Sequence, residues 1–160
     1  MTRLTRRGLK DAVESCARFF RVVVARAFSA GADAARERVT VFHGTDVDSA
    51  LRLLNGEPLD AAKAAASKID GPPGFFLTTE YADAEYFALR RAPGGVLQYE
   101  VSGTALVQLD RAGLSRRPIP PGKLFTPVGD ELAVPVNAFD LFNRLRSAGE
   151  VVVTPAKGAP

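Results

Sequence analysis

Three side chains that could do chemistry stand far apart in the 160-residue chain, each in a short segment at an expected strand end or strand-to-helix corner. His43, the chain's one histidine, closes the apolar run of VTVFHGT, Tyr86 lies in GFFLTTEYADAEYFA, and Glu131 lies in GDELAVP. An imidazole can hydrogen-bond hydroxyl groups, an aromatic ring can grip a flat ligand ring, and a carboxylate can stabilise developing positive charge. Each residue alone also fits a structural role, so the indication of a site comes from the three segments together.

The ordered set of segments resembles the ADP-ribosyltransferase superfamily, in the diphtheria-toxin and poly(ADP-ribose) polymerase branch that carries a His-Tyr-Glu triad. In that branch a strand ends in His-Gly followed by Ser or Thr, an aromatic-rich strand precedes a helix with a tyrosine, and a glutamate opens a late strand. The resemblance covers roughly residues 39–155. The matching positions are His43-Gly44-Thr45, Gly74-Phe75-Phe76-Leu77, Tyr86 and Glu131.

The resemblance implies NAD+ as a co-substrate and a role for each matching residue. His43 would hold ribose hydroxyls, and Tyr86 and Phe76 would sandwich the nicotinamide ring. Gly44-Thr45 would let the backbone approach the carboxamide, because glycine has no β-carbon to obstruct it. Cleavage of the nicotinamide–ribose bond builds positive charge on the sugar, as in glycoside cleavage, and Glu131 would stabilise that transition state.

Two departures from the family pattern bear on these roles. Phe76 stands where polymerase relatives carry a further tyrosine, so its ring can stack but offers no hydroxyl. Tyr81, five residues before Tyr86 and on a different helical face, is a rival for the triad tyrosine and a further candidate NAD+ contact. The arginine-bearing branch of the superfamily ranks below, because position 129, two before Glu131, is glycine and not an acidic or amide residue.

The function expected from the resemblance is that of a mono-ADP-ribosyltransferase, in a bacterial toxin or effector, whose acceptor is a macromolecule and a protein in preference to a nucleic acid. Two alternatives stay open: an NAD+ glycohydrolase with water as the acceptor, and a binding module on the same fold with an inactive site. A cognate antitoxin or immunity protein, or a second copy docking through the N-terminal helix, would be further partners. We expect segments 111–122 and Asp60–Lys68 to contact the acceptor, because loops carry specificity.

The elements that would position these residues belong to an α+β fold, because strands outnumber helices after residue 38 without a regular βαβ alternation. The resemblance refines this to an ADP-ribosyltransferase-like split mixed β-sheet with short helices. Expected strands are Val39–His43, Phe75–Thr78, Val96–Val101, Ala105–Leu109, Lys123–Val128, Glu131–Val136 and Glu150–Thr154. Expected helices run from Asp46 or Asp48 to Leu54, from a Thr79 cap to about Arg91, and over Ala138–Ser147. The alanine-rich segment Asp60–Lys68 is expected to form a second short helix or a mobile loop.

Charge patterning separates a basic arm, 1–38, from the rest of the chain. The resemblance implies that 39–155 is the catalytic domain, and 156–160 is expected to be a flexible tail. The arm holds nine Lys or Arg and four Asp or Glu, and its apolar residues recur at the spacing of an amphipathic helix. The rest of the chain holds twelve basic and fourteen acidic residues. A body that binds nucleic acid by charge alone is therefore not expected.

Cysteine content and hydropathy exclude further classes of protein. The single cysteine, Cys16, cannot form an internal disulfide, and nothing pairs with His43 at metal-ligand spacing, so no metal site is expected. No apolar run approaches the eighteen or so residues that a membrane span needs, and arginines interrupt the apolar segment of the arm, so we expect neither a span nor a cleaved secretion signal. A cytoplasmic protein is expected, or one delivered to the cytosol of a target cell by another export route.

Overall fold

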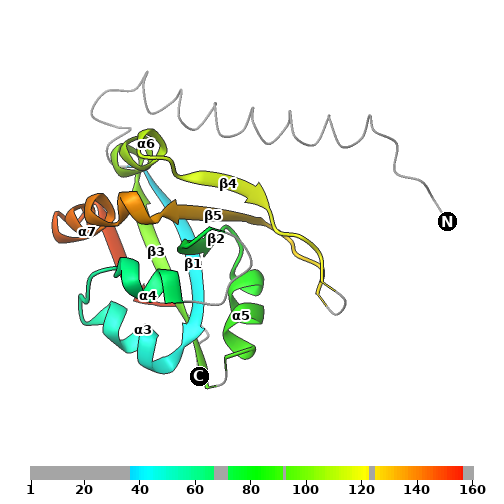
Figure 1. Ribbon diagram of the computed structural model, residues 1–160. Coiled ribbons are helices and arrows are strands. Elements are labelled where there is room, and N and C mark those ends of the chain that lie inside the picture. Colours follow the sequence, from blue (N-terminus) through cyan, green and yellow to red (C-terminus); the bar gives the residue numbers. More distant parts are fainter. Residues whose placement is uncertain (1–36, 67–71, 92, 123–124, 157–160) are drawn as a thin grey trace, which may run out of the picture.

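The computed structural model describes residues 37–66, 72–91, 93–122 and 125–156, which form one antiparallel sheet with short helices on both faces (Figure 1). This arrangement confirms the α+β class. The strands are β1 (Arg38–Asp46), β2 (Gly74–Thr78), β3 (Gly94–Ser102), β4 (Ser115–Pro118), β5 (Asp130–Pro135) and β6 (Val151–Pro155). The helices are α3 (Val47–Leu54), α4 (Ala61–Ala66), α5 (Tyr81–Leu89), α6 (Gly103–Arg111) and α7 (Phe139–Ser147), the last preceded by a 3-10 turn at Val136–Ala138.

The strands follow the order β4-β5-β2-β1-β3-β6, and each neighbouring pair is antiparallel. The expectation of a mixed sheet is therefore wrong. Two neighbouring strands are parallel only when the chain crosses back to the same end of the sheet between them. Among the described strands, no neighbouring pair runs in the same direction.

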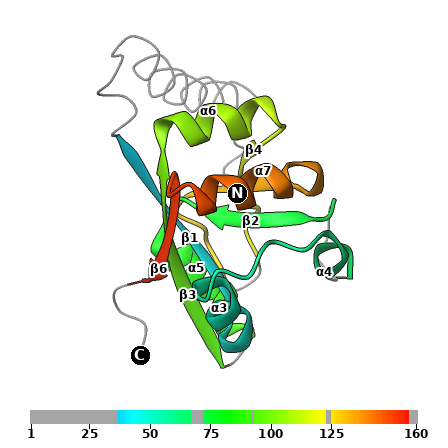
Figure 2. The same cartoon turned by 90° about the vertical axis from the view of Figure 1, so that its left-hand side faces the viewer.

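The sheet consists of two halves that are joined narrowly. β1 and β3 pair over nine positions, whereas β1 meets β2 in the described register at one position, Phe42 opposite Thr78. Figures 1 and 2 show that β4, β5 and β2 run in a different direction from β1, β3 and β6. The strands β1 and β2 therefore diverge on one side of this junction.

The larger core lies on the face of the sheet that α3, α6 and α7 cover, and of the described helices α5 packs on the other face (Figure 2). Alternate strand residues point to each face, which gives the core its apolar side chains from β1, β2, β3, β5 and β6. Its fully buried members include Val41, Leu97, Tyr99, Val134 and Phe142.

Helix α5 approaches the sheet more closely than side chains would normally allow. A β-carbon at Gly44 would overlap the carbonyl oxygen of Ala84, and one at Gly94 would overlap that of Ala88. The two glycines on the strands and the two alanines on the helix therefore let the backbones touch. This packing holds α5, which carries Tyr86, directly against β1, which carries His43.

Capping side chains define two of the helix starts. Asp46 accepts a hydrogen bond from the Ser49 N–H at 2.8 Å and begins α3, as expected, and Gly56 follows its end with a φ of +87°. Ser102 accepts from the Ala105 N–H at 3.1 Å and begins α6. The expected strand over Ala105–Leu109 is therefore wrong, because this cap and a buried helical stripe outweigh the local preference for strand.

Three further expectations fail for local reasons. Thr79 does not cap α5, whose N-cap is Glu80; the Thr79 hydroxyl instead accepts from the Asp130 N–H at 2.9 Å. The expected strand over Lys123–Val128 is missing from the described residues 125–128, where Phe125 makes one bridge to Gly122. The proline- and arginine-rich segment 110–122, expected from the sequence to be a loop, contains the short edge strand β4, whose prolines obscured the signal.

The basic arm lies outside the described residues apart from 37 and 38, so its expected helix is not addressed, and the same holds for 157–160 of the tail. Ala156, in contrast, is buried, and its N–H donates to the Val96 carbonyl at 3.0 Å. Among the described residues, no helix combines the length and apolar character needed to cross a membrane.

Candidate functional site

A cavity of about 850 Å³ opens where the two halves of the sheet diverge, and His43, Tyr86 and Glu131 all line it. Strands β1, β2 and β5, helices α3, α4 and α5, and the segment between β4 and β5 all contribute to its wall. Its volume is in the range of small-molecule and cofactor sites. The three residues that the sequence marked, which lie 43 and 45 positions apart, thus meet at one hollow.

The register of the strands sets the width of this site. Glu131 lies opposite Thr78, and Thr78 lies opposite Phe42, the residue before His43. Two strand spacings therefore separate the backbone at Glu131 from that of β1, roughly 10 Å. Such a separation suits a ligand that extends across the cavity, not one ion or atom held by all three groups.

His43 is neutral and fixed in orientation. Its Nδ1 lies 2.7 Å from the Phe76 carbonyl oxygen, so Nδ1–H donates and the other ring nitrogen, Nε2, keeps its lone pair. Its ring also packs on Phe75, with centroids 4.4 Å apart. The pKa of His43 is lowered to about 4, chiefly by burial and to a smaller extent by the positive charge of Arg91, while the hydrogen bond to Phe76 and the charge of Asp46 act in the opposite direction. The imidazole is therefore uncharged near neutral pH and set up to hydrogen-bond, with one nitrogen donating and the other able to accept.

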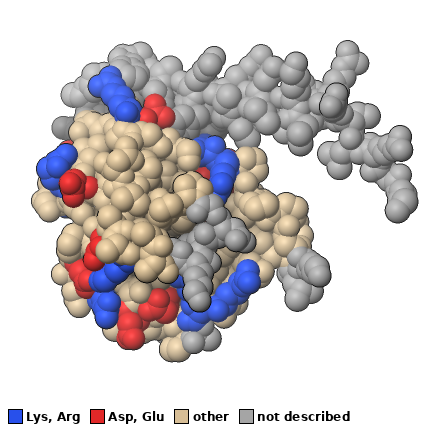
Figure 3. All heavy atoms as spheres, in the orientation of Figure 1, with Lys and Arg blue, Asp and Glu red and all other residues tan. Residues whose placement is uncertain are grey.

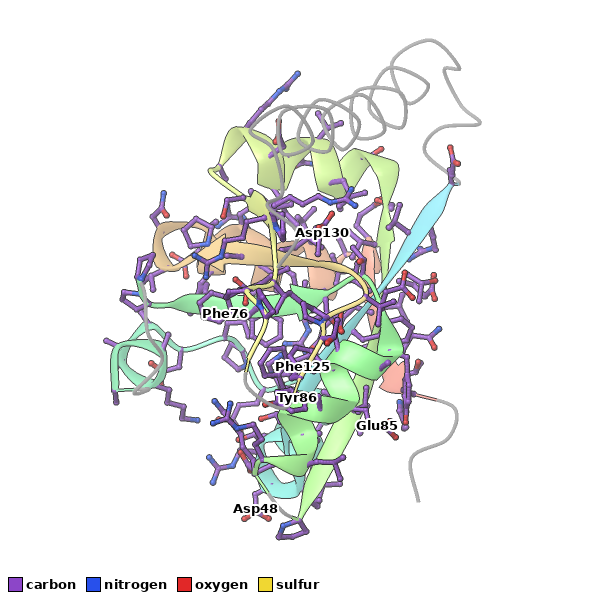
Figure 4. All side chains as sticks on the ribbon, turned by 90° about the vertical axis from the view of Figure 1, so that its right-hand side faces the viewer. Asp48, Phe76, Glu85, Tyr86, Phe125 and Asp130 are labelled. Carbon is purple, nitrogen blue, oxygen red and sulfur yellow. The ribbon has the colours of Figure 1, made fainter. Side chains whose placement is uncertain are left out.

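Tyr86 presents its ring in an aromatic group at the cavity wall (Figure 4). The ring of Phe125 stacks on it, with centroids 3.8 Å apart and an angle of 6° between planes, and Phe87 meets both rings edge to face. Phe76 lines the same cavity from β2. One face of the Tyr86 ring is thus covered by Phe125, so a ligand ring can stack on Tyr86 only by displacing Phe125 or by using the opposite face of the tyrosine ring.

Glu131 is held by an arginine from the edge strand. Arg117, opposite it on β4, donates from Nε and Nη2 to Oε1 of Glu131 at 2.8 and 2.7 Å. The Glu131 side chain is 14% exposed and that of Arg117 is 48% exposed. The hydrogen bonds of the described residues leave Oε2 of Glu131 without a donor, so one carboxylate oxygen remains able to accept from a ligand.

A buried carboxylate ties the helix of Tyr86 to the strand of Glu131. Asp83, which is fully buried, accepts from the Val128 N–H at 3.1 Å and from the Gly129 N–H at 2.8 Å. A β-carbon at Gly129 would collide with the side chains beneath it, so glycine is required there. Asp83 lies one helical turn before Tyr86 and accepts from the backbone two residues before Glu131. It therefore fixes the spacing between these two elements.

The other sequence-marked residues divide between the cavity and its surroundings. Gly44 and Thr45 line the cavity, although Gly44 is also required for the packing of α5. Tyr81 does not line it: its ring packs edge-on against Phe42, and its hydroxyl donates to Glu85 at 3.4 Å. Burial, with the adjacent Glu85, raises the pKa of Tyr81. Of the two tyrosines considered for the triad, only Tyr86 is at the site.

Sequence reasoning missed several groups at or beside the cavity. Arg117 and Phe125 belong to a proline-rich segment with no periodicity, and Asp83 resembles an ordinary acidic residue in a first helical turn. Arg90 and Arg91 resemble a solvated helix end.

Among the described residues, no three His, Cys, Asp or Glu side chains are grouped so as to hold a metal ion. Comparisons with protein-family models, curated proteins and solved structures found no significant match to this chain.

Proposed function

We propose that this protein cleaves NAD+ at the nicotinamide–ribose bond and transfers ADP-ribose to a macromolecular acceptor, with an ADP-ribosyltransferase-like domain over residues 39–155. The observation that carries the proposal is the meeting of His43, Tyr86 and Glu131 at one cavity large enough for a dinucleotide. Three residues that matched the family pattern only by chance would not be expected to line the same cavity. The proposal extends the sequence resemblance, on which the choice of NAD+ depends.

The proposed binding roles follow from the side-chain geometry. The Nε2 lone pair of His43 accepts from a ribose hydroxyl, and the bond from Nδ1 to Phe76 keeps this tautomer in place. The ring of Tyr86 stacks on nicotinamide, a contact worth about 0.5–1.5 kcal/mol beyond the area it buries. Phe76 contributes apolar surface to the same slot.

Glu131 is the proposed catalytic residue. As the bond from C1′ of the ribose to the nicotinamide nitrogen breaks, its electron pair leaves with neutral nicotinamide and positive charge develops on the sugar. The Glu131 carboxylate stabilises that charge or holds a ribose hydroxyl through Oε2, while Arg117 keeps the side chain in one orientation. An acceptor nucleophile then attacks C1′ and releases its proton to solvent. Loss of the carboxylate should raise the barrier by about 2.7–4 kcal/mol, by analogy with the deletion of one preorganised electrostatic group.

Two segments border the cavity where an acceptor would approach. Asp60 and Lys63 line it from α4 and its start, and Arg117, Ile119 and Pro120 line it from the other side. These residues belong to the segments in which sequence reasoning placed acceptor contacts. Their position at the wall supports that assignment, because an acceptor must reach C1′ through an opening of the same cavity.

The experiment that tests the proposal is incubation with NAD+ labelled in the adenylate, with and without cell lysate, wild type beside Glu131→Gln. We expect nicotinamide release and macromolecule-bound label with the wild type, and a loss of about a hundredfold or more with Glu131→Gln. Digestion with protease or with nuclease then identifies the acceptor class. Nicotinamide release without bound label in any lysate would establish the glycohydrolase alternative. No release by the wild type under any condition would overturn the proposal.

A further inference from the structure

The positive charge of the cavity is unevenly neutralised. Among the residues that the structure describes, five cationic and three carboxylate side chains line it: Arg52, Lys63, Arg90, Arg91, Arg117, Glu57, Asp60 and Glu131. Arg52 and Lys63 both pair with Glu57, and Arg117 pairs with Glu131. Arg90 and Arg91 make no ion pair within the described ranges. The surplus of positive charge therefore lies at the C-terminal end of α5.

This arginine pair is close to the candidate ring and sugar contacts. Arg90 follows Tyr86 by one helical turn, and its guanidinium carbon lies 5.8 Å from the centre of the Tyr86 ring. Arg91 is near enough to His43 for its charge to act on the imidazole. In the view of Figure 3, basic side chains gather between the positions that α3 and α5 occupy in Figure 1. A ligand that stacks on Tyr86 therefore lies near the Arg90 guanidinium, and a ligand group that contacts His43 lies within the field of Arg91.

We propose that Arg90 and Arg91 form a subsite for the diphosphate of a dinucleotide, an assignment that rests on the NAD+ site proposed above. A diphosphate carries two negative charges, and a guanidinium fork binds phosphate oxygens through two parallel hydrogen bonds. The nicotinamide ribose is adjacent to the diphosphate in NAD+, as the arginines are adjacent to the ring and sugar contacts. Arg90 and Arg91 therefore select substrates with phosphate, and Tyr86 selects the ring.

The test compares three substrates that share the reacting bond: nicotinamide riboside, nicotinamide mononucleotide and NAD+, which carry no, one and two phosphates. Nicotinamide release is measured for the wild type and for Arg90→Gln/Arg91→Gln. We expect the double substitution to lower kcat/KM for NAD+ by about tenfold to a hundredfold, mostly through KM, because a hydrogen bond to a charged group is worth about that factor. Turnover of the riboside should change less than twofold.

The matched control is Arg111→Gln/Arg144→Gln, which removes the same charge from two exposed arginines outside the cavity and should leave all three substrates unaffected. Arg90→Lys/Arg91→Lys keeps the charge but not the fork, and should recover part of the NAD+ activity. Equal losses with the riboside and NAD+, or no loss with NAD+, would overturn the subsite.

Failure of the proposed function and failure of the subsite can be told apart. If the wild type releases nicotinamide from none of the three substrates, the proposed function fails, and binding of ADP-ribose is measured by calorimetry instead. A tenfold or greater loss of ADP-ribose affinity in Arg90→Gln/Arg91→Gln supports the diphosphate subsite. Equal affinity in the two proteins, or no binding to either, overturns it.

Discussion

Replacing Asp83 by alanine should destabilise the protein by about 3–5 kcal/mol. The carboxylate is fully buried and accepts two backbone hydrogen bonds, from Val128 and Gly129, and a bond to a charged acceptor contributes roughly 1.5–3 kcal/mol. Its removal leaves two N–H groups without an acceptor, although part of the loss is offset because a buried charge no longer has to be desolvated. Asp83→Asn keeps one carbonyl oxygen and should cost about 2 kcal/mol.

The assay is equilibrium unfolding in urea, followed by circular dichroism because the chain has no tryptophan. Asp48→Ala is the matched control, since Asp48 is an exposed carboxylate in the first turn of α3, and its change should stay within about 0.5 kcal/mol. A loss below about 1 kcal/mol for Asp83→Ala would refute the reasoning, because the two bonds would then contribute no more than an ordinary surface contact.

Three other predictions concern stability. The pKa of His43 is 6.5 in the unfolded chain and about 4 in the folded protein, so the unfolded state takes up the proton first as the pH falls. About 3 kcal/mol of stability should therefore be lost between pH 6.5 and pH 4. Urea midpoints measured at both pH values should show a smaller loss for His43→Asn than for the wild type. Gly44→Ala should destabilise by about 2–3 kcal/mol because its β-carbon meets the Ala84 backbone, whereas Gly95→Ala, with 3.5 Å to its nearest neighbour, should be milder in the same unfolding assay. Tyr99→Phe should leave the melting temperature unchanged or raise it, since no described residue bonds the buried Tyr99 hydroxyl.

The elements that the sequence predicted best are those in which local pattern and burial agree. The run VLQYEV alternates, and it forms the centre of β3, while α3 begins at the Asp46 cap and ends at Leu54, as expected. Ala105–Leu109 failed because ALVQL suits a buried strand or a helix equally well, and only the Ser102 cap before it distinguishes the two.

The site itself divides in the same way between local and long-range information. His43, Tyr86 and Glu131 could be singled out because each lies in a recognisable short segment, but their meeting depends on the divergence of β1 from β2, which no local pattern encodes. Arg117 reaches Glu131 only through the register of β4 with β5, and Phe125 reaches Tyr86 only through the path of the segment between those strands. Contacts of this kind follow from topology, so sequence reasoning could not supply them.

The most direct test of the account is a crystal structure of Glu131→Gln grown with NAD+, since this variant should bind the dinucleotide without cleaving it. The account predicts the nicotinamide ring within stacking distance of Tyr86, a ribose hydroxyl within hydrogen-bond distance of His43, and C1′ next to residue 131. A dinucleotide bound elsewhere on the protein, or none bound at millimolar NAD+, would contradict the claim that these three residues form one NAD+ site.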